Sequence, residues 1–345
     1  MMRTGFAVFL AALAFLGSPA VAASKASPPP DLNQPVAFPG GVMATPDLVY
    51  AQIEGFRPLT LDLYQMPAKA KEPPRPAILF VHGGLWAKGD ARHLAGFDDL
   101  PGLLASLAAK NYVVVSVNYR LAGEAHFPAA VQDVKSALRW LRIHAADYDV
   151  DTTRVMAWGA EAGGQIAALA GTSCGVNVLE PIADAASKAP TASDCVQGVI
   201  DWAGPADLPN WEPPHAEAGA PTALGAYMGC EPVDCAPGAI KAASPLSYAN
   251  TLSPSFLIQQ GATDALVPVA QSRALYDALQ ILHVPSSLVV YPEVGGNFTR
   301  NGAADPATQA KVISDMEDFI AKTFPPIAIA KAEKAPAPKT RTKRK

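Results

Sequence analysis

One short glycine-rich stretch constrains the fold of this chain more than any other: residues 158–164 read WGAEAGG. The apolar run RVMA precedes it, and the run QIAALA follows it. A short apolar run of this kind is typical of a buried strand, and the following run favours a helix. Glycines at 159 and 163 allow the backbone to reverse tightly between the two. The stretch therefore predicts a strand, a sharp turn and a helix, with the side chain of Glu161 exposed at the turn.

Similar apolar runs recur along the chain, separated by segments with helical spacing. The runs expected to be strands are residues 48–51, 59–64, 77–81, 112–117, 199–202, 256–258 and 288–291. Alternating buried strands and helices predict an α/β fold, a mostly parallel twisted sheet with helices on both faces. Gly55 lies between the first two runs, which favours an antiparallel pair there. Residues 173–195 and 210–244 are expected to be irregular insertions at the C-terminal edge of the strands.

The chain divides into four parts by composition. Residues 1–22 have a basic start at Arg3, an apolar core and an AVA cleavage site, which together predict a signal peptide and export to the periplasm or the outside. Residues 23–46 are rich in Pro, Ala and Ser and are expected to be a flexible lead-in. Residues 47–325 are expected to form the α/β domain, and residues 326–345 a disordered basic tail.

The charge is unevenly distributed. The net charge is −4, yet the residues from Lys331 onward hold seven basic side chains against the single acid Glu333. The preceding body is therefore more acidic than the whole chain, which argues against nucleic acid as a partner. The basic tail could contact an anionic surface; the alternative is a solvated tail without a partner. The sequence leaves the oligomeric state open.

Four cysteines lie in the two irregular insertions, and none forms a C-x-x-C pair, so zinc is not expected. In an exported protein two disulfides are the natural interpretation. Three pairings are open, and we favour Cys174–Cys195 with Cys230–Cys235 because each closes a local loop. Four free thiols remain the alternative.

Four motifs occur in order at the ends of the expected strands: HGG at 82–84, NYRL at 118–121, FPA at 127–129 and the turn around Glu161. With them the chain resembles the α/β-hydrolase superfamily, and more closely its HGG-containing esterase branch, which includes feruloyl- and acetylxylan-esterase-like carboxylesterases. The resemblance covers residues 47–324. The segments DWAGPADL at 201–208 and DALVP at 264–268 also match that family.

The resemblance implies a serine nucleophile at the turn, an acid in the D-x-x-V-P segment and a histidine after the last strand. The acid maps to Asp264, but the serine position is Glu161 and the histidine position is Gly296. The oxyanion hole maps to backbone N–H groups of Gly83, Gly84 and Ala162. Because these groups belong to the backbone, side-chain replacement is expected to leave them in place.

These replacements remove the chemistry of a serine esterase, which needs a nucleophile activated by a base. Glycine can neither accept nor donate a proton, so Asp264 has nothing to orient. We therefore expect an exported carboxylesterase-like protein without serine-esterase activity, either a pseudoenzyme or an inactivated variant. Glu161 lies at a helix N-terminus and is longer than serine, which predicts that its carboxylate fills the oxyanion hole.

Other functions remain open. The first alternative is an active ester hydrolase with a non-standard nucleophile or base, for which His93, His126 and His215 are the candidate bases. A second is a glycan- or cell-wall-binding protein. Glu161 and Asp264 could also act as a carboxylate pair, as in glycoside hydrolysis, but nothing else in the sequence favours it. The expected ligand is a small-molecule or glycan ester, and no cofactor or metal is implied.

Overall fold

The structure, a computed structural model, describes residues 34–68, 72–180, 192–212 and 221–325. The expected signal peptide (1–22), the tail (326–345) and His215 lie outside these residues, as do part of the lead-in and of both insertions. Within the described ranges, none of the helices combines the length and the apolar character that crossing a bilayer requires.

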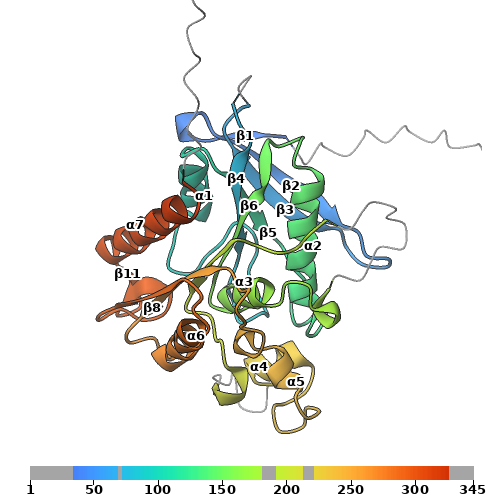
Figure 1. Cartoon of the computed structure of the whole chain (residues 1–345), viewed down its shortest axis with the longest axis vertical. Helices are drawn as coiled ribbons and strands as arrows, with labels where there is room; N and C mark the ends of the chain where they lie inside the picture. The colour runs from blue at the N-terminus through green and yellow to red at the C-terminus, as the bar shows by residue number, and fades with distance from the viewer. Residues whose placement is uncertain (1–33, 69–71, 181–191, 213–220, 326–345) are drawn as a thin grey trace, which may run out of the picture. The chain divides into compact units, whose positions relative to one another are not determined.

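A nine-stranded sheet forms the centre of the described part, in the order β1-β2-β3-β5-β4-β6-β7-β8-β9 (Figure 1). The six strands from β5 to β9 in this order are parallel, whereas β1, β2 and β3 are antiparallel to their neighbours. The expected α/β sheet is thus confirmed. Its strands are β1 (Val36–Ala37), β2 (Met43–Ala51), β3 (Leu59–Gln65), β4 (Arg75–Val81), β5 (Val113–Val117), β6 (Val150–Ala160), β7 (Gly198–Trp202), β8 (Ser255–Gly261) and β9 (Ser286–Tyr291).

Helices cover both faces of this sheet, which buries the side chains on both sides of the central strands. Side chains of α1 and α7 share one buried cluster, and side chains of α2, α3 and α6 share the other. Figure 1 shows α1 and α7 on one flank of the strands and α2 on the other. Along β4, Ala77, Leu79 and Val81 join the second cluster, whereas Ile78 and Phe80 join the first. The helices are α1 (Leu100–Ala108), α2 (Ala129–Ile143), α3 (Ala162–Thr172), α4 (Ala223–Met228), α5 (Ala239–Ala242), α6 (Val269–Ile281) and α7 (Pro306–Thr323).

The sheet begins earlier than the sequence suggested. Residues up to 46 were expected to be a flexible lead-in, but β1 and the first part of β2 pair with each other and β2 pairs with β3. The side chains of Val42 and Ala44 are buried in the cluster that also holds Tyr64 and Ile78. This burial holds residues 36–46 on the domain, so the expected boundary at 47 is corrected to about residue 36.

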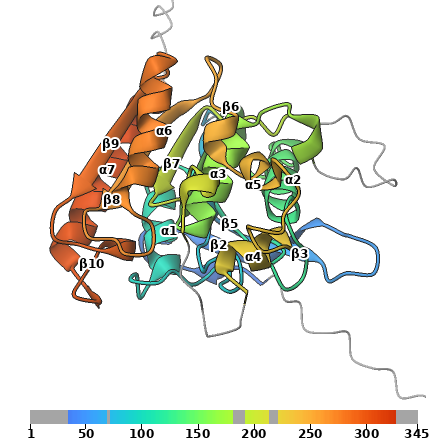
Figure 2. The same cartoon turned by 90° about the horizontal axis from the view of Figure 1, so that it is seen from below.

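The insertion at 210–244 is likewise more regular than expected, because it contains α4 and α5. Thr222 caps α4 by accepting a hydrogen bond from the backbone N–H of Gly225 at 2.9 Å, and Gly229 ends the helix in the left-handed conformation. Figures 1 and 2 both place α4 and α5 near α3. Gln165 of α3 donates to the carbonyl of Ala243, directly after α5.

Candidate active site

The turn between β6 and α3 has the geometry that the glycine spacing predicts. Glu161 has φ 56° and ψ −118°, a conformation that costs energy for a residue with a side chain. A Cβ atom on Gly159 would collide with the backbone of Gly163, and one on Gly163 would collide with the backbone of Val81. The close approach of these strands and the helix therefore requires both glycines. The backbone N–H of Glu161 donates to the carbonyl of Trp202 at 2.7 Å, which ties the turn to β7.

The carboxylate of Glu161 turns toward the loop that follows β4. Its Oε2 atom accepts hydrogen bonds from the backbone N–H groups of Gly84 at 2.6 Å and Leu85 at 3.3 Å. A Cβ atom on Gly83 would lie 2.8 Å from the same oxygen, so the backbone of Gly83 also borders the carboxylate. Ala162 is the first residue of α3 and is buried. Among the hydrogen bonds of the described residues, neither Gly83 nor Ala162 donates to this carboxylate.

Leu85 was not among the residues expected from the sequence. Its N–H belongs to the peptide that joins Gly84 to Leu85, and both residues have positive φ, at 104° and 54°. Trp86 is buried, donates to Gln165 at 2.9 Å and stacks on Tyr227 with ring centroids 4.5 Å apart. These contacts hold the loop against α3 and α4. No sequence signal marks a leucine as a donor, since the bond depends on backbone conformation alone.

His82 supports the same loop, and within the described residues no hydrogen bond joins it to the Glu161 carboxylate. Its ring is buried, stacks on Tyr119 with centroids 4.3 Å apart, and has its Nδ1 atom 2.8 Å from the carbonyl of Gly83. Burial lowers the pKa of His82 to about 4, so the ring is neutral at neutral pH. The Tyr119 hydroxyl donates to the carbonyl of His82 at 3.1 Å. The HGG histidine is thus a packing residue.

Asp264 follows β8 and is held by three donors. Its Oδ1 atom accepts from the backbone N–H groups of Leu266 at 2.8 Å and Val267 at 3.0 Å, and its Oδ2 atom accepts from Gln260 at 3.2 Å. Partial burial raises the pKa of Asp264, and the three hydrogen bonds oppose that rise. The carboxyl group is therefore fixed in orientation while remaining a titratable acid.

Gly296 follows β9 and lies directly against Asp264. A Cβ atom built on Gly296 would be 3.3 Å from both oxygens of Asp264, and its nearest neighbours would all be atoms of that carboxyl group. The structure thus brings together the two positions that the sequence assigned to the acid and the histidine. As glycine, residue 296 offers no group that can accept a proton from a nucleophile.

The other candidate bases are directed elsewhere. His93 is 81% exposed at its side chain and pairs with Asp90 at 2.8 Å. His126 has its Nδ1 atom 3.0 Å from the carbonyl of Ala226. In the described part of the chain, no hydrogen bond joins either histidine to Glu161 or Asp264. Nor do the described residues contain a cluster of three His, Cys, Asp or Glu that could hold a metal ion.

Two disulfides lie in the two insertions. The first lies before the amino end of β7, so this part of the insertion at 173–195 is not at the C-terminal edge of the strands, where it was expected. Cys174 is bonded to Cys195 with Cα atoms 4.9 Å apart, and Cys230 is bonded to Cys235 with Cα atoms 5.3 Å apart. Arg142 of α2 donates to the carbonyl of Cys195. The first disulfide therefore joins the end of α3 to the segment before β7, and α2 supports the junction.

Comparison with known proteins places this geometry in a family. The BD-FAE family model matches residues 61–279, which include Gly84, Glu161 and Asp264. The chain belongs to the BD-FAE family. Gly296 lies beyond the matched range. Family membership agrees with the expected resemblance to esterases of the α/β-hydrolase superfamily, and the protein is a carboxylesterase-like member of that superfamily.

Among curated relatives of this BD-FAE protein, Esterase LipQ from Mycobacterium tuberculosis is 34% identical over 276 residues, 80% of this chain and 62% of the relative. The chain spans 53–62% of the length of the first three such relatives.

Two solved structures share the fold. One is a truncated carbohydrate esterase from gut microbiota, with a TM-score of 0.65 and 24% identity over 83% of this chain and 98% of the other. The second, Thermogutta terrifontis esterase 2 phosphorylated by paraoxon, has a TM-score of 0.63 and 25% identity, over 82% and 94%.

Proposed function

We propose that this protein is an exported member of the BD-FAE family that has lost serine-esterase chemistry and acts by binding at the former acyl site. The observation that carries the proposal is the 2.6 Å hydrogen bond from the N–H of Gly84 to Oε2 of Glu161. An oxyanion hole stabilises the negative charge that develops on a substrate carbonyl. In this protein an internal carboxylate already accepts that hydrogen bond.

The arrangement of Asp264 and Gly296 supports the same proposal. In the triad mechanism the histidine takes the proton of the nucleophile and the acid orients the histidine. Asp264 is held in place to orient such a group, but Gly296 supplies none. Removing triad members leaves only the rate enhancement of binding and of the oxyanion hole, on the order of 10³–10⁴-fold over water. Glu161 reduces even this remainder, because it competes with substrate for the hole.

The experiment is hydrolysis of p-nitrophenyl acetate by the mature protein and by the Glu161→Ser/Gly296→His double variant. We expect no turnover above the buffer rate for the former, and turnover for the latter, since the two positions meet the retained Asp264 and the Gly84 N–H. The matched control is the double variant with Asp264→Asn added, which removes the orienting acid. Turnover by the unaltered protein well above the buffer rate would show that the proposal is wrong.

A second candidate is an active ester hydrolase with a non-standard nucleophile or base. It is favoured by the esterase relatives, among them LipQ. Within the described residues His93 and His126 make their contacts away from Glu161, so this candidate needs His215 or a water molecule as the base. Turnover by the unaltered protein, abolished by His215→Ala and not by His93→Ala, would favour it. Binding of a glycan or cell wall without turnover remains a third outcome, which retention on insoluble glycan would detect.

Export rests on the sequence of residues 1–22 and on the two disulfides, which persist in oxidising compartments. Cleavage after Ala22 is the expected processing step, and N-terminal sequencing of the secreted protein tests it. The chain then comprises the domain and the basic tail at 326–345.

A further inference from the structure

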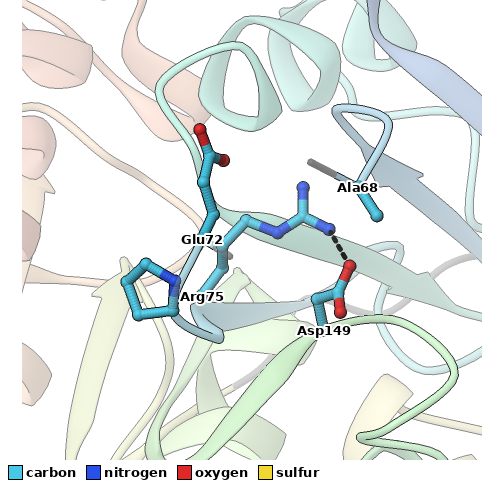
Figure 3. Close-up of a pocket in the computed structure, with 5 residues that line it drawn as sticks. Ala68, Glu72, Arg75 and Asp149 are labelled. Carbon is cyan, nitrogen blue, oxygen red and sulfur yellow. Dashed lines mark ion pairs between the residues drawn. The ribbon is translucent and has the colours of Figure 1, made fainter. Parts of the chain in front are cut away.

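Arginine side chains hold several acids of this domain. Arg120 pairs with Asp133 at 2.6 Å, and Arg75 pairs with Asp149 at 3.6 Å; Figure 3 shows the second pair at the pocket that it lines. Asp264 differs from both acids. In the described part of the chain no basic side chain forms an ion pair with its carboxyl group, which accepts hydrogen bonds only from neutral N–H donors. The position of this carboxyl group therefore depends on those donors.

Two of the three donors belong to the turn after β8. The backbone N–H groups of Leu266 and Val267 donate to Oδ1 of Asp264 at 2.8 Å and 3.0 Å. The third donor is Nε2 of Gln260 in β8, which reaches Oδ2 at 3.2 Å. A carboxylate offers about four acceptor positions, so one position on Oδ2 is left. A Cβ atom on Gly296 would lie 3.3 Å from that oxygen.

The surroundings of Gln260 set the orientation of its amide. Its Nε2 atom also lies 3.1 Å from the carbonyl of Val267 and 3.4 Å from that of Gly261, so all three partners of this nitrogen are acceptors. On the other side of the amide, the hydroxyl of Ser272 in α6 donates to Oε1 at 2.7 Å. A reversed amide would place its oxygen against three acceptors. The donor is thus kept directed at Asp264.

The polar side chain at 260 lies where packing alone would favour an apolar one. Gln260 and Ser272 are both fully buried. Ile258 lies two residues earlier on the same face of β8 and belongs to the apolar cluster that also holds Leu275 of α6. A buried amide costs free energy unless its polar atoms are hydrogen-bonded. The hydrogen bond to Asp264 gives this buried glutamine a role beyond filling space.

We propose that Gln260 is a positioning residue for Asp264, and that Ser272 holds the Gln260 amide in the orientation that donates. Gln260 fixes the second oxygen of the acid, so that its remaining acceptor position is kept for a donor at residue 296. The meaning of position 296 rests on the proposed function, whereas the chain of hydrogen bonds from α6 to the acid does not. This support is complete although residue 296 is glycine.

NMR of carboxyl-labelled aspartate tests the proposal by measuring the pKa of Asp264, with Asp264→Asn to assign its signal. Gln260→Met keeps the volume of the side chain but cannot donate. Because a hydrogen bond to the charged form lowers the pKa of a carboxyl group, we expect the pKa of Asp264 to rise by about one pH unit in this variant. An unchanged pKa would overturn the proposal.

Gln259→Met is the matched control. Gln259 is the neighbour of Gln260 in β8, is equally buried and points to the opposite face, where it donates to the hydroxyl of Tyr291. We expect this variant to leave the pKa of Asp264 unchanged. The same rise in both variants would show a general effect of losing a buried glutamine, and the proposal would be wrong.

Two variants of Ser272 test the second link and leave Gln260 in place, should Gln260→Met fail to fold. Ser272→Ala removes the donor to Oε1 and should raise the pKa of Asp264 by less than Gln260→Met does. Ser272→Thr keeps a hydroxyl and should retain the pKa of the unaltered protein. Equal pKa values in Ser272→Ala and the unaltered protein would show that Ser272 does not hold the amide.

Kinetics of the Glu161→Ser/Gly296→His variant separate this proposal from the proposed function. Adding Gln260→Met should lower kcat for p-nitrophenyl acetate about tenfold with KM unchanged, because a displaced acid no longer orients the histidine. Adding Gln259→Met should change neither constant. A higher KM with unchanged kcat would show that Gln260 acts on ligand binding and would overturn the positioning role. A double variant without turnover would count against the proposed function alone, since the pKa measurements need no activity.

Discussion

Glu161 brings a carboxylate to the N–H of Gly84, whereas Gly296 offers no proton acceptor beside Asp264. Both positions could be predicted from the sequence, because glycine spacing and chain order can be read directly. The donor Leu85 could not, since the direction of its N–H depends on the backbone angles of Gly84 and Leu85, both of which have positive φ. At this scale the sequence gives the identity of each side chain, but it does not give the direction in which a backbone N–H points.

Asp201 is a second residue whose state depends on the fold. It is fully buried at the end of β7, beside the turn at Glu161, and its Oδ1 atom accepts from the N–H of Gly204 at 2.7 Å. Its Oδ2 atom has no partner in the described structure. Burial raises the pKa of Asp201 to about 7, because the charged form is poorly solvated there.

This raised pKa has a defined effect on stability. The folded state holds the proton of Asp201 more tightly than the unfolded state, so its contribution to the unfolding free energy falls as pH rises from about 4 to about 7. The full change is up to about 4 kcal/mol for three pKa units. We expect Asp201→Asn to lose this dependence and to gain stability relative to the unaltered protein between pH 5 and pH 8.

Urea denaturation of both proteins at pH 5 and pH 8 measures the effect, and the difference between the two pH slopes isolates Asp201 from other titrating groups. Asp133 and Asp264, whose pKa values are also raised by burial, are unchanged in the variant. Identical pH slopes for the two proteins would show that Asp201 is ionised in the folded state throughout this range.

At the scale of elements, the sequence predicted uninterrupted strands better than interrupted ones. The run expected at 59–64 lies within β3, Leu59–Gln65. Strand β2 begins at Met43, five residues before the expected run at 48. Its register shifts between Thr45 and Leu48, where Asp47 has a positive φ of 55°. This irregularity breaks the period-2 pattern, so the first part of the strand resembled a linker.

The strand boundary can be tested by comparing chains that begin at residue 34 and at residue 47. The shorter chain loses β1 and the start of β2, and with them the buried side chains of Val42 and Ala44. We expect the free energy of unfolding to fall by about 3 kcal/mol or more, from lost apolar burial and the exposed edge of β3. The midpoint of urea denaturation measures this difference. Equal midpoints would restore the boundary at 47.

Across the whole described molecule, different features lie at the two ends of the parallel strands. The carboxyl ends of β4, β6, β8 and β9 lead to the loops that hold Gly84, Glu161, Asp264 and Gly296. This convergence could be predicted, because parallel strands end at one edge of a sheet. A groove of about 270 Å³ at the amino ends of β4, β5 and β6 could not, since its walls include Pro74, Tyr112 and Phe324, which come from distant segments with no motif in common.

The disulfides stabilise the molecule unequally, because their loops differ in length. Cys174 and Cys195 are 21 residues apart, and Cys230 and Cys235 are 5 apart. Loop-closure entropy in the unfolded chain assigns about 3 kcal/mol to the first and about 2 kcal/mol to the second. We therefore expect Cys174→Ser/Cys195→Ser to lower the free energy of unfolding more than Cys230→Ser/Cys235→Ser.

In the folded state, contacts other than the disulfide also hold the longer loop. Buried Lys135 of α2 donates to the carbonyl of Ser173 at 2.7 Å and pairs with Asp194 at 2.8 Å, so residues next to both cysteines of the longer loop are anchored to the domain. These contacts keep the native loop in place without its disulfide, and the loss then reports mainly on the unfolded chain. Guanidinium denaturation of the two double variants at one pH measures both losses. A larger loss for the short loop would mean that strain or local packing, and not chain entropy, sets the contribution of these disulfides.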